Sequence, residues 1–467
     1  MSLRKLHPLV TLFVCFWLLA GCRYAEAYYQ CSDDRGGGLC PDGNTCCLLP
    51  DGTSGCIASD MGTYNATCCS MDENIPTFTG CGVGYQCHTT SNMENICVAT
   101  NRSPLADPLV HVLPRYQLCQ TDKIKTVHGL PLSASRRFAS TSKLAYYSSH
   151  GPLESIPSSA SFDMIFVFVH GSGRNADDYF CAATKITQIQ TRYDNVLVVA
   201  PRFLGNTDPA RSENPSFLYW EDEGSGPWRF GADAIGPEPI SSFDAFDTMV
   251  NVIGKLFPDA ELFSVVGHSS GGQFVQRWSL LTSYWDMARM RSVVANPSSY
   301  AYLTPLRFIN GGWQEVQGAT KENCPHYNQW EWGLDPGGEL EVPYRRRAFT
   351  NESYVIQRFN DRFVTYLSGG VDRCNVSDPN GWCHSHGLEV NCVDELQGSN
   401  RFERAERYMA MLRMVGIGPE NHNRYIVDGV GHDHTLMFQS TVGINAIFGR
   451  TPKLNFGDEW LGRALTT

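Results

Sequence analysis

The sequence predicts an α/β fold, a mostly parallel β-sheet flanked by helices, preceded by a small disulfide-rich domain. From about residue 116, β-branched and aromatic segments of strand length alternate with helix-like segments. This alternation is typical of a parallel sheet that helices cover on both faces. Earlier in the chain, ten cysteines fall between Cys31 and Cys97 in a stretch with few long apolar runs. Such a segment needs disulfides, because its core alone is too small to stabilise it.

Length and composition narrow the class of protein. A chain of 467 residues is long enough for about two to three domains. Hydrophobic residues make up 42% and charged residues 18%, which excludes a coiled coil and a disordered chain. The formal net charge of -11 has the wrong sign for binding a phosphate backbone, so no nucleic-acid partner is expected.

The N-terminus has the pattern of a secretory signal. Arg4 and Lys5 precede the apolar run PLVTLFVCFWLLA, and small residues end at Ala27. The run is shorter than the roughly 20 residues that span a bilayer. We therefore expect residues 1–27 to be a signal peptide cleaved near Ala27, and the mature chain to be secreted with no stable membrane insertion. An uncleaved signal anchor and, in a bacterial host, a lipid anchor at Cys22 in the segment LAGC stay open.

The remaining cysteines fall into two even groups. Ten lie between Cys31 and Cys97, and six lie between Cys119 and Cys392. Even numbers in an exported protein favour a closed set of disulfides over a reactive thiol, although the sequence leaves their pairing open. Four Asn-x-Ser/Thr glycosylation sites agree with export: Asn65, Asn101, Asn351 and Asn375.

Residues 28–97 resemble a granulin module. The resemblance lies in the segment CPDGNTCCLLPDGTSGC, which begins at Cys40, and in the later pair Cys68–Cys69. That family has four adjacent cysteine pairs and this segment keeps two, so we describe it as a diverged, granulin-like module. A zinc site is disfavoured in an oxidising compartment. The sequence does not identify a protein partner for the module.

A proline-containing linker is predicted at residues 98–115, followed by a second, larger domain at 116–467, in which about residues 303–360 form an insertion between two predicted strands. Two helices are predicted, at 241–257 and at 400–415. Ser241 and Asp244 are placed to cap the start of the first. The predicted strands are 164–170, 195–201, 262–268, 291–297, 363–369 and 423–430.

The strongest motif follows the strand predicted at 262–268. Gly267-His268-Ser269-Ser270-Gly271 lies between that strand and a helical stretch, which is the context of a G-x-S-x-G nucleophile elbow. Glycine is needed at both ends, because in this tight turn a Cβ at Gly267 or Gly271 would collide with neighbouring backbone. The turn also places Ser269 at a helix N-terminus, which favours developing negative charge. Ser269 is therefore the predicted nucleophile.

A serine nucleophile needs a base, and the base needs an acid that orients it. FVTYLSGGVDRC places Asp372 just past a late strand, and NRYIVDGVGHDHTLMF places His432 after the last strand. These are the predicted acid and base. His434 is the rival for the base, whereas Asp378 and Asp361 are rivals for the acid. His268 is interpreted as a packing residue, and Asp428 and Asp433 as local hydrogen-bond acceptors.

The elbow motif and the order Ser, Asp, His resemble the α/β-hydrolase superfamily over roughly residues 120 to 450. The resemblance implies the α/β-hydrolase fold with a catalytic triad of Ser269, Asp372 and His432. The stretches CPHYNQWEWGL, YLSGGVD, LQGSNRFERAERY and GVGHDHTLMF are similar to a group of secreted fungal and bacterial hydrolases. That similarity implies no particular substrate.

Acyl transfer passes through an oxyanion that two aimed donors must bind. The backbone N–H of Ser270, next to the nucleophile, is the first candidate. The second comes from the segment FVFVHGSGRNADDYF, which resembles the family's oxyanion loop and suggests the Ser172 amide, with Gly173 or Gly171 as alternatives.

Other chemistries find little support. The chain has no G-x-G-x-x-G, Walker or H-E-x-x-H motif, and no cofactor is expected. Cys383, His384 and His386 could be imagined as a metal site. In a protein that is expected to be exported, however, Cys383 and its neighbouring cysteines more often form disulfides. The aromatic residues of the insertion line a substrate pocket or fill the insertion's own core: Trp313, Tyr327, Trp330 and Trp332.

These observations predict a secreted serine hydrolase that cleaves carboxylic esters, small or polymeric, through an acyl-enzyme. Esters are favoured because esterases and lipases are common among exported proteins of this fold. A serine peptidase that uses the same triad is the first alternative. The second is a non-enzymatic binding or signalling protein, in which a degenerate hydrolase domain carries the granulin-like module.

Overall fold

The computed structural model describes residues 127–449, except 136–139, 191–194, 223–225, 337–341, 350, 375–384 and 386, and eight short strands between residues 28 and 99. By its internal contacts, the chain divides into two compact units, Met1–Val112 and Leu113–Thr467. The predicted signal peptide, most of the predicted linker and three of the glycosylation sites lie outside the described residues: Asn65, Asn101 and Asn375.

The described strands of the first unit pair in antiparallel fashion, as β1 with β2, β3 with β4, β5 with β6 and β7 with β8. In the register of two of these pairs, Cys46 lies opposite Cys56 and Cys87 opposite Cys97. The granulin-like assignment stays a prediction. The bounds are β1 Tyr28–Gln30, β2 Leu39–Pro41, β3 Asn44–Leu48, β4 Ser54–Ala58, β5 Thr67–Cys68, β6 Gly80–Cys81, β7 Tyr85–Thr89 and β8 Asn95–Ala99.

The second unit contains an eight-stranded sheet in the order β20-β19-β16-β15-β11-β12-β10-β9. The six strands from β20 to β12 run parallel, whereas β10 and β9 are antiparallel to their neighbours. The mostly parallel sheet predicted from the sequence is confirmed. The strands are β9 His128–Pro131, β10 Lys143–Ser148, β11 Met164–Val169, β12 Val196–Arg202, β15 Leu262–His268, β16 Met290–Ala295, β19 Phe363–Gly369 and β20 His422–Val427.

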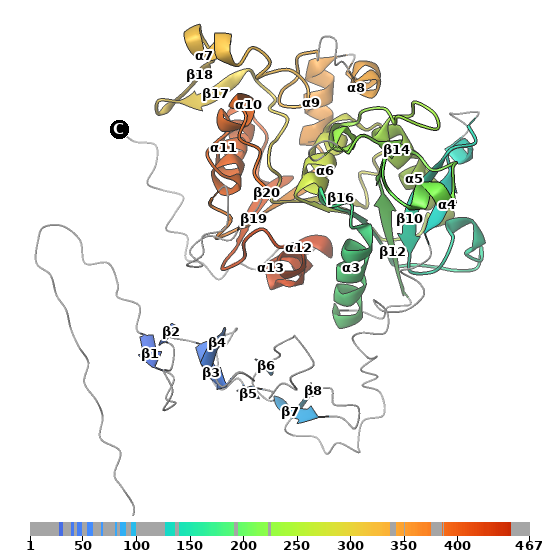
Figure 1. Cartoon of the computed structure of the whole chain (residues 1–467), viewed down its shortest axis with the longest axis vertical. Helices are drawn as coiled ribbons and strands as arrows, with labels where there is room; N and C mark the ends of the chain where they lie inside the picture. Colours follow the sequence, from blue (N-terminus) through green and yellow to red (C-terminus); the bar gives the residue numbers. More distant parts are fainter. Residues whose placement is uncertain are drawn as a thin grey trace, which may run out of the picture. The chain divides into compact units, whose positions relative to one another are not determined.

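Helices cover both faces of this sheet, so that the sheet is the middle of three layers (Figure 1). Along β11, Ile165, Val167 and Val169 pack in one core with α5, α6, α9 and α11, whereas Phe166 and Phe168 pack in the other with α3, α12 and α13. Side chains alternate between the faces because a strand has a two-residue period. The helices are α3 Ala176–Gln190, α5 Ser242–Leu256, α6 Ser270–Leu281, α9 Glu352–Asn360, α11 Arg401–Met414, α12 His434–Gln439 and α13 Thr441–Ile447.

The helix predicted at 241–257 is α5, and its first turn has a side-chain cap. Ser241 accepts a hydrogen bond from the Phe243 N–H, whereas Asp244 forms an ion pair with Arg347. Within the described residues, no helix is long and apolar enough to cross a membrane. The shorter elements are η1 Leu132–Ser135, η2 Leu153–Ser155, β13 Leu204–Gly205, α4 Ala210–Glu213, β14 Tyr219–Trp220 and η4 Pro227–Phe230.

The region predicted as an insertion begins with a hairpin and ends in the main core. It contains β17 Leu306–Ile309, β18 Gly312–Glu315, α7 Gly318–Asn323 and α8 Pro343–Ala348, followed by α9. Val355 and Phe359 of α9 are fully buried in the core that lies against the sheet. A disulfide between Cys324 and Cys392 joins the region to α10 Cys392–Glu395. The last part of this region therefore belongs structurally to the sheet layer.

The aromatic residues of this region pack internally. Trp330 is 6% exposed and donates a hydrogen bond to the Phe230 carbonyl, and Trp332 donates to Asp394. Tyr327 lies in a small core cluster, and Trp313 packs on Phe308 at 5.6 Å between ring centroids. These contacts favour the structural interpretation of the four aromatic residues over the pocket interpretation.

A buried carboxylate, Asp247, joins three helices. Its Oδ1 accepts hydrogen bonds from Trp278 Nε1 at 2.8 Å and Thr282 Oγ1 at 2.6 Å, and its Oδ2 accepts one from the Tyr344 hydroxyl at 2.6 Å. Burial raises the pKa of Asp247 from 3.8 to about 6, against the opposing effect of these donors. Folding therefore favours the protonated form, and the stabilisation from this group is present below about pH 4 and lost as the pH rises through about 6.

We expect Asp247→Asn to fold with little loss of stability, because the amide oxygen still accepts two bonds and its NH₂ donates to the Tyr344 oxygen. In the wild type, the unfolding free energy should decrease by about 3 kcal/mol between pH 4 and pH 7 as Asp247 ionises, and the Asp247→Asn variant should not show this decrease. Asp247→Ala leaves three buried donors without a partner and should cost about 2–5 kcal/mol. Urea unfolding across this pH range measures both variants, and equal losses of stability in the two would contradict the expectation.

Candidate active site

The turn between β15 and α6 has the geometry of a strained elbow. Ser269 precedes α6 with φ 60° and ψ −124°, a conformation that costs a non-glycine residue about 1–3 kcal/mol. A Cβ added at Gly267 would lie 2.2 Å from the Gly271 carbonyl oxygen, and one at Gly271 would lie 2.2 Å from that of Val169. The backbone therefore approaches itself too closely for any residue larger than glycine at these two positions.

Three predicted side chains meet at the carboxyl edge of the sheet. The Ser269 hydroxyl donates to His432 Nε2 at 2.9 Å, and His432 Nδ1 donates to Asp372 Oδ2 at 2.8 Å. The residues follow strands β15, β20 and β19 respectively, whose parallel arrangement brings their ends together. Exposure decreases along the series, from 9% at Ser269 to 3% at His432 and 0% at Asp372.

The buried carboxylate of Asp372 faces a buried cation, Arg401, at the start of α11. Arg401 Nη1 lies 3.6 Å from Asp372 Oδ1, and both side chains are almost fully buried. The guanidinium is held by hydrogen bonds to Ser385 Oγ at 2.8 Å and to the Gly387 carbonyl at 2.9 Å. Burial lowers the pKa of Arg401 to about 10, and Asp372 opposes that shift, so Arg401 is positively charged at neutral pH. A buried charge needs such a partner.

The loop after β11 lies against the nucleophile. A Cβ added at Gly171 would be 3.7 Å from the Ser269 Cβ. His170 Nε2 accepts from the Phe203 N–H at 3.0 Å, so its proton lies on Nδ1, which donates to the Gly171 carbonyl at 2.7 Å. In a trans peptide the N–H points opposite to the C=O, so this bond turns the Ser172 N–H away from His170. Burial lowers the pKa of His170 to about 3, which keeps the ring neutral.

The first predicted oxyanion donor, the Ser270 amide, lies at the start of α6. Ser270 is the first helical residue, so its N–H falls outside the helix's own i to i−4 hydrogen bonds. The N–H of Ser269 itself is bonded to the Ala295 carbonyl at 2.9 Å. Of these two amides, that of Ser270 is the one available to an oxyanion bound at Ser269.

The rival histidines have different surroundings. The ring of His434, at the start of α12, stacks on Tyr179 with centroids 4.2 Å apart and an interplanar angle of 7°. His268 is 2% exposed, its ring centroid lies 4.5 Å from that of His432, and its Nδ1 lies 3.3 Å from the Tyr179 hydroxyl. Burial and the neighbouring histidines lower the pKa of His268 well below its usual value. These contacts are those of packing residues around His432.

The rival acids lie elsewhere. Asp361 is exposed at the C-terminal end of α9, next to the amino end of β19. Asp378 lies outside the described residues. Asp433 caps α12 by accepting a hydrogen bond from the Leu436 N–H at 2.8 Å, and Asp428 is exposed after β20. Of the acids that the structure describes, Asp372 is the one bonded to His432.

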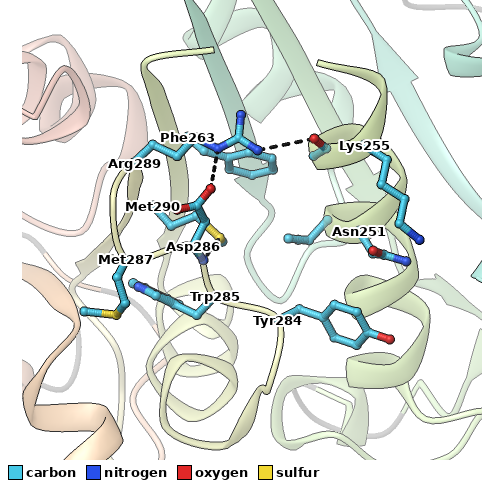
Figure 2. Close-up of a pocket in the computed structure, with 11 residues that line it drawn as sticks. Asn251, Lys255, Phe263, Tyr284, Trp285, Asp286, Met287, Arg289 and Met290 are labelled. Atoms are coloured by element: carbon cyan, nitrogen blue, oxygen red, sulfur yellow. Dashed lines mark hydrogen bonds and ion pairs between the residues drawn. The ribbon is translucent and has the colours of Figure 1, made fainter. Parts of the chain in front are cut away.

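A cavity of about 470 Å³ lies at the opposite edge of the sheet (Figure 2). It is lined by residues near the amino ends of strands, such as Phe263 on β15 and Met290 on β16. Figure 2 shows Arg289 paired with Asp286 beside it, with an Nε–Oδ2 distance of 2.8 Å. This cavity is separated from Ser269 by the length of β15.

The part of the chain that the structure describes contains no candidate metal site. No group of three or more His, Cys, Asp or Glu residues there is arranged to hold a metal ion. The sequence pattern around Cys383, His384 and His386 lies outside the described residues, and the nearby Cys374 is disulfide-bonded.

Comparisons with known proteins identify the family. The model described as the alpha/beta hydrolase family matches residues 166–442, which is more than half of the chain. No curated protein sequence gives a significant match.

Among solved structures, poly(aspartic acid) hydrolase-1 from Sphingomonas sp. KT-1 is 18% identical with a TM-score of 0.44, over 69% of this chain and 98% of that one. The LpqC poly(3-hydroxybutyrate) depolymerase from Bordetella parapertussis is 19% identical with a TM-score of 0.44, over 70% and 92%. Est1E from Butyrivibrio proteoclasticus is 11% identical with a TM-score of 0.31, over 69% and 98%. From the family match over residues 166–442, this chain belongs to the alpha/beta hydrolase family.

Proposed function

We propose that this chain is a serine hydrolase that cleaves carboxylic esters with Ser269 as nucleophile, His432 as base and Asp372 as the acid that orients the base. The observation that carries the proposal is the continuous hydrogen-bonded series from the Ser269 hydroxyl through His432 to Asp372. A neutral hydroxyl is a weak nucleophile, and an imidazole within hydrogen-bond distance removes its proton as it attacks.

In the first half-reaction, Ser269 Oγ attacks the ester carbonyl carbon while its proton moves to His432 Nε2. The tetrahedral intermediate collapses as His432 returns that proton to the leaving alkoxide, which departs as an alcohol and leaves an acyl-serine. Water then attacks the acyl carbonyl and gives its proton to His432. Collapse releases the carboxylic acid and restores the Ser269 hydroxyl.

Fixed charges and dipoles stabilise this sequence. Asp372 stabilises the imidazolium that forms on His432, and Arg401 compensates the buried Asp372 carboxylate. The amides of Ser172 and Ser270 are the proposed oxyanion donors. Two observations support that role: Gly171, the residue before Ser172, lies beside Ser269, and Ser270 is the first residue of α6.

The choice of an ester as substrate rests on the prevalence of ester hydrolysis among exported proteins of this fold. A triad of this kind also cleaves peptide bonds, so peptide hydrolysis is the alternative that the assay must distinguish. Purified protein assayed with nitrophenyl esters of increasing acyl length and with chromogenic peptides should hydrolyse the esters. Hydrolysis of the peptides alone would replace the esterase proposal with a peptidase.

The proposal is tested most directly by covalent labelling with a fluorophosphonate. Wild-type protein should incorporate one probe per chain, and Ser269→Ala should incorporate none. Ser270→Ala is a matched control, because it removes the adjacent hydroxyl and keeps the backbone N–H. Folded wild-type protein that neither reacts with the probe nor hydrolyses an ester or peptide would favour the non-enzymatic binding function instead.

The Ser172 amide can be tested by removing its proton. Ser172→Pro eliminates the N–H and should lower kcat by about 10²–10³-fold, the usual effect of losing one oxyanion donor. Ser172→Ala keeps the N–H and should stay within threefold of wild type. Steady-state ester hydrolysis, with circular dichroism to establish folding, measures the pair. Equal activity of the two variants would assign the second donor to another amide, such as that of Gly173.

We also propose that the chain is exported after cleavage near Ala27 and that residues 28–97 form a granulin-like module. The Cys324–Cys392 disulfide supports an oxidising compartment. N-terminal sequencing of the protein recovered from the culture medium and from the membrane fraction tests the cleavage site. Membrane-bound protein that keeps the first 27 residues, with none in the medium, would favour a signal anchor.

A further inference from the structure

Asn296, the residue after β16, has an unusual backbone conformation for its position. Its φ is 42°, in the left-handed region that favours glycine, and its side chain is 3% exposed. Glycine adopts this region without strain, and asparagine adopts it more readily than most other residues. The buried Asn296 side chain makes two hydrogen bonds that glycine would lack.

Both polar atoms of the Asn296 amide bind the backbone of loops that carry the triad. Asn296 Oδ1 accepts from the Gly369 N–H at 2.8 Å, and Asn296 Nδ2 donates to the Gly431 carbonyl at 3.0 Å. Gly431 immediately precedes His432. Gly369 begins the turn that ends at Asp372, because the Asp372 N–H donates to the Gly369 carbonyl at 3.1 Å. One amide group therefore joins the loop of the base to the turn of the acid.

The same strand end also holds the nucleophile. The Ser269 N–H donates to the carbonyl of Ala295, the residue before Asn296, at 2.9 Å. The acid and base loops are packed backbone to backbone, because a Cβ added at Gly369 would lie 2.6 Å from the Gly431 oxygen and 3.1 Å from Asn296 Nδ2. Residues 295 and 296 thus contact all three loops from which the triad is built.

We propose that Asn296 is a positioning residue that sets the distance between His432 and Asp372; this inference rests on the proposed function. The side-chain hydrogen bonds of Asn296 go to the backbone of these two loops, so its proposed action is on the loops. A displacement of about 1 Å in a catalytic group lowers rates by about 10²-fold. Losing the amide bridge should therefore lower the chemical rate while substrate binding stays near normal.

Two variants remove the bridge in different ways. Asn296→Asp keeps the size and the acceptor for Gly369, but places a carboxylate oxygen against the Gly431 carbonyl. Asn296→Gly removes both bonds and relieves the strain at φ 42°, which favours folding. In the full-length protein, both should lower kcat for a nitrophenyl ester by about 10²-fold, with KM within threefold of wild type. The rate of fluorophosphonate labelling should fall in parallel.

Asn310 provides the matched control. It also has a positive φ, of 52°, but it is exposed in the turn between β17 and β18. Asn310→Asp and Asn310→Gly apply the same chemical changes outside the triad and should leave kcat and KM unchanged.

The outcomes separate this inference from the proposed function. Wild-type protein that does not react at Ser269 would remove the proposed function itself. Wild-type protein that reacts, together with Asn296 variants that keep wild-type kcat per folded molecule and only unfold at a lower temperature, would overturn the positioning role. A loss expressed in KM with kcat unchanged would overturn it as well.

Discussion

A His432→Ala variant should lose ester hydrolysis by a factor on the order of 10⁵–10⁶ in kcat, the cost of removing the histidine from a serine triad. The physical reason is that the Ser269 hydroxyl then has no acceptor for its proton, since Nε2 of His432 lies 2.9 Å from it. The burst of nitrophenol that accompanies acylation should also disappear. A steady-state assay corrected for spontaneous hydrolysis of the ester measures the loss in kcat, and stopped-flow absorbance measures the burst.

The matched control for this variant is His434→Phe. His434 lies two residues away and stacks on Tyr179, and phenylalanine preserves that stacking. Its activity should stay within about tenfold of wild type, because a change in a packing residue costs far less than the loss of a triad member. If His434→Phe were inactive and His432→Ala active, the assignment of the base would be reversed.

An Asp372→Asn variant should lose about 10⁴-fold in kcat per folded molecule, and its stability should also fall because Arg401 loses its buried partner. Asp372 Oδ2 accepts a hydrogen bond from His432 Nδ1, with 2.8 Å between the two atoms. The ring proton is thereby held on Nδ1, and Nε2 accepts the hydrogen bond from Ser269. An asparagine can present its NH₂ to Nδ1 instead, which favours the tautomer with the proton on Nε2. In that tautomer His432 is not a base toward Ser269. The substitution also removes the negative charge that faces the buried Arg401.

Asp433→Asn applies the same change next to His432. Asp433 caps α12, and asparagine is an equally good N-cap residue, so neither activity nor stability should change measurably. Single-turnover acylation with a nitrophenyl ester measures both variants at the chemical step. Full activity of Asp372→Asn would mean that another acid orients His432.

The strands that the sequence analysis identified are those with the longest apolar runs. The predictions at 262–268 and 363–369 match β15 and β19 residue for residue. These strands are buried on both faces, which produces continuous β-branched and aromatic runs. Strands β9 and β10, at the antiparallel end of the strand order, were not predicted from the sequence. Strand β9 is a four-residue edge strand, and β10, with the sequence KLAYYS, contains no β-branched residue, so neither has the long apolar run by which the other strands were predicted.

The groups around the predicted triad escaped the sequence analysis for a different reason. Arg401 and Asn296 carry no motif of their own, and an arginine at a helix start or an asparagine after a strand is common on a protein surface. The sequence feature that could have identified Asn296 is its place directly after β16, because β16 pairs with β15, the strand that leads to Ser269. The contacts of both residues are made with segments far away in the chain, which no local pattern records.

The sequence by itself determined the class of fold and the candidate chemistry, because apolar periodicity and glycine spacing act over a few neighbouring residues. It also provided a serine, an acid and a base in the order that the superfamily uses. The sequence favoured His432 and Asp372 but kept His434 and Asp361 as rivals, and only the tertiary structure shows that His432 is bonded to Ser269 and Asp372 to His432. That choice depends on hydrogen bonds of about 3 Å between loops, whose geometry is produced by the packing of parallel strands.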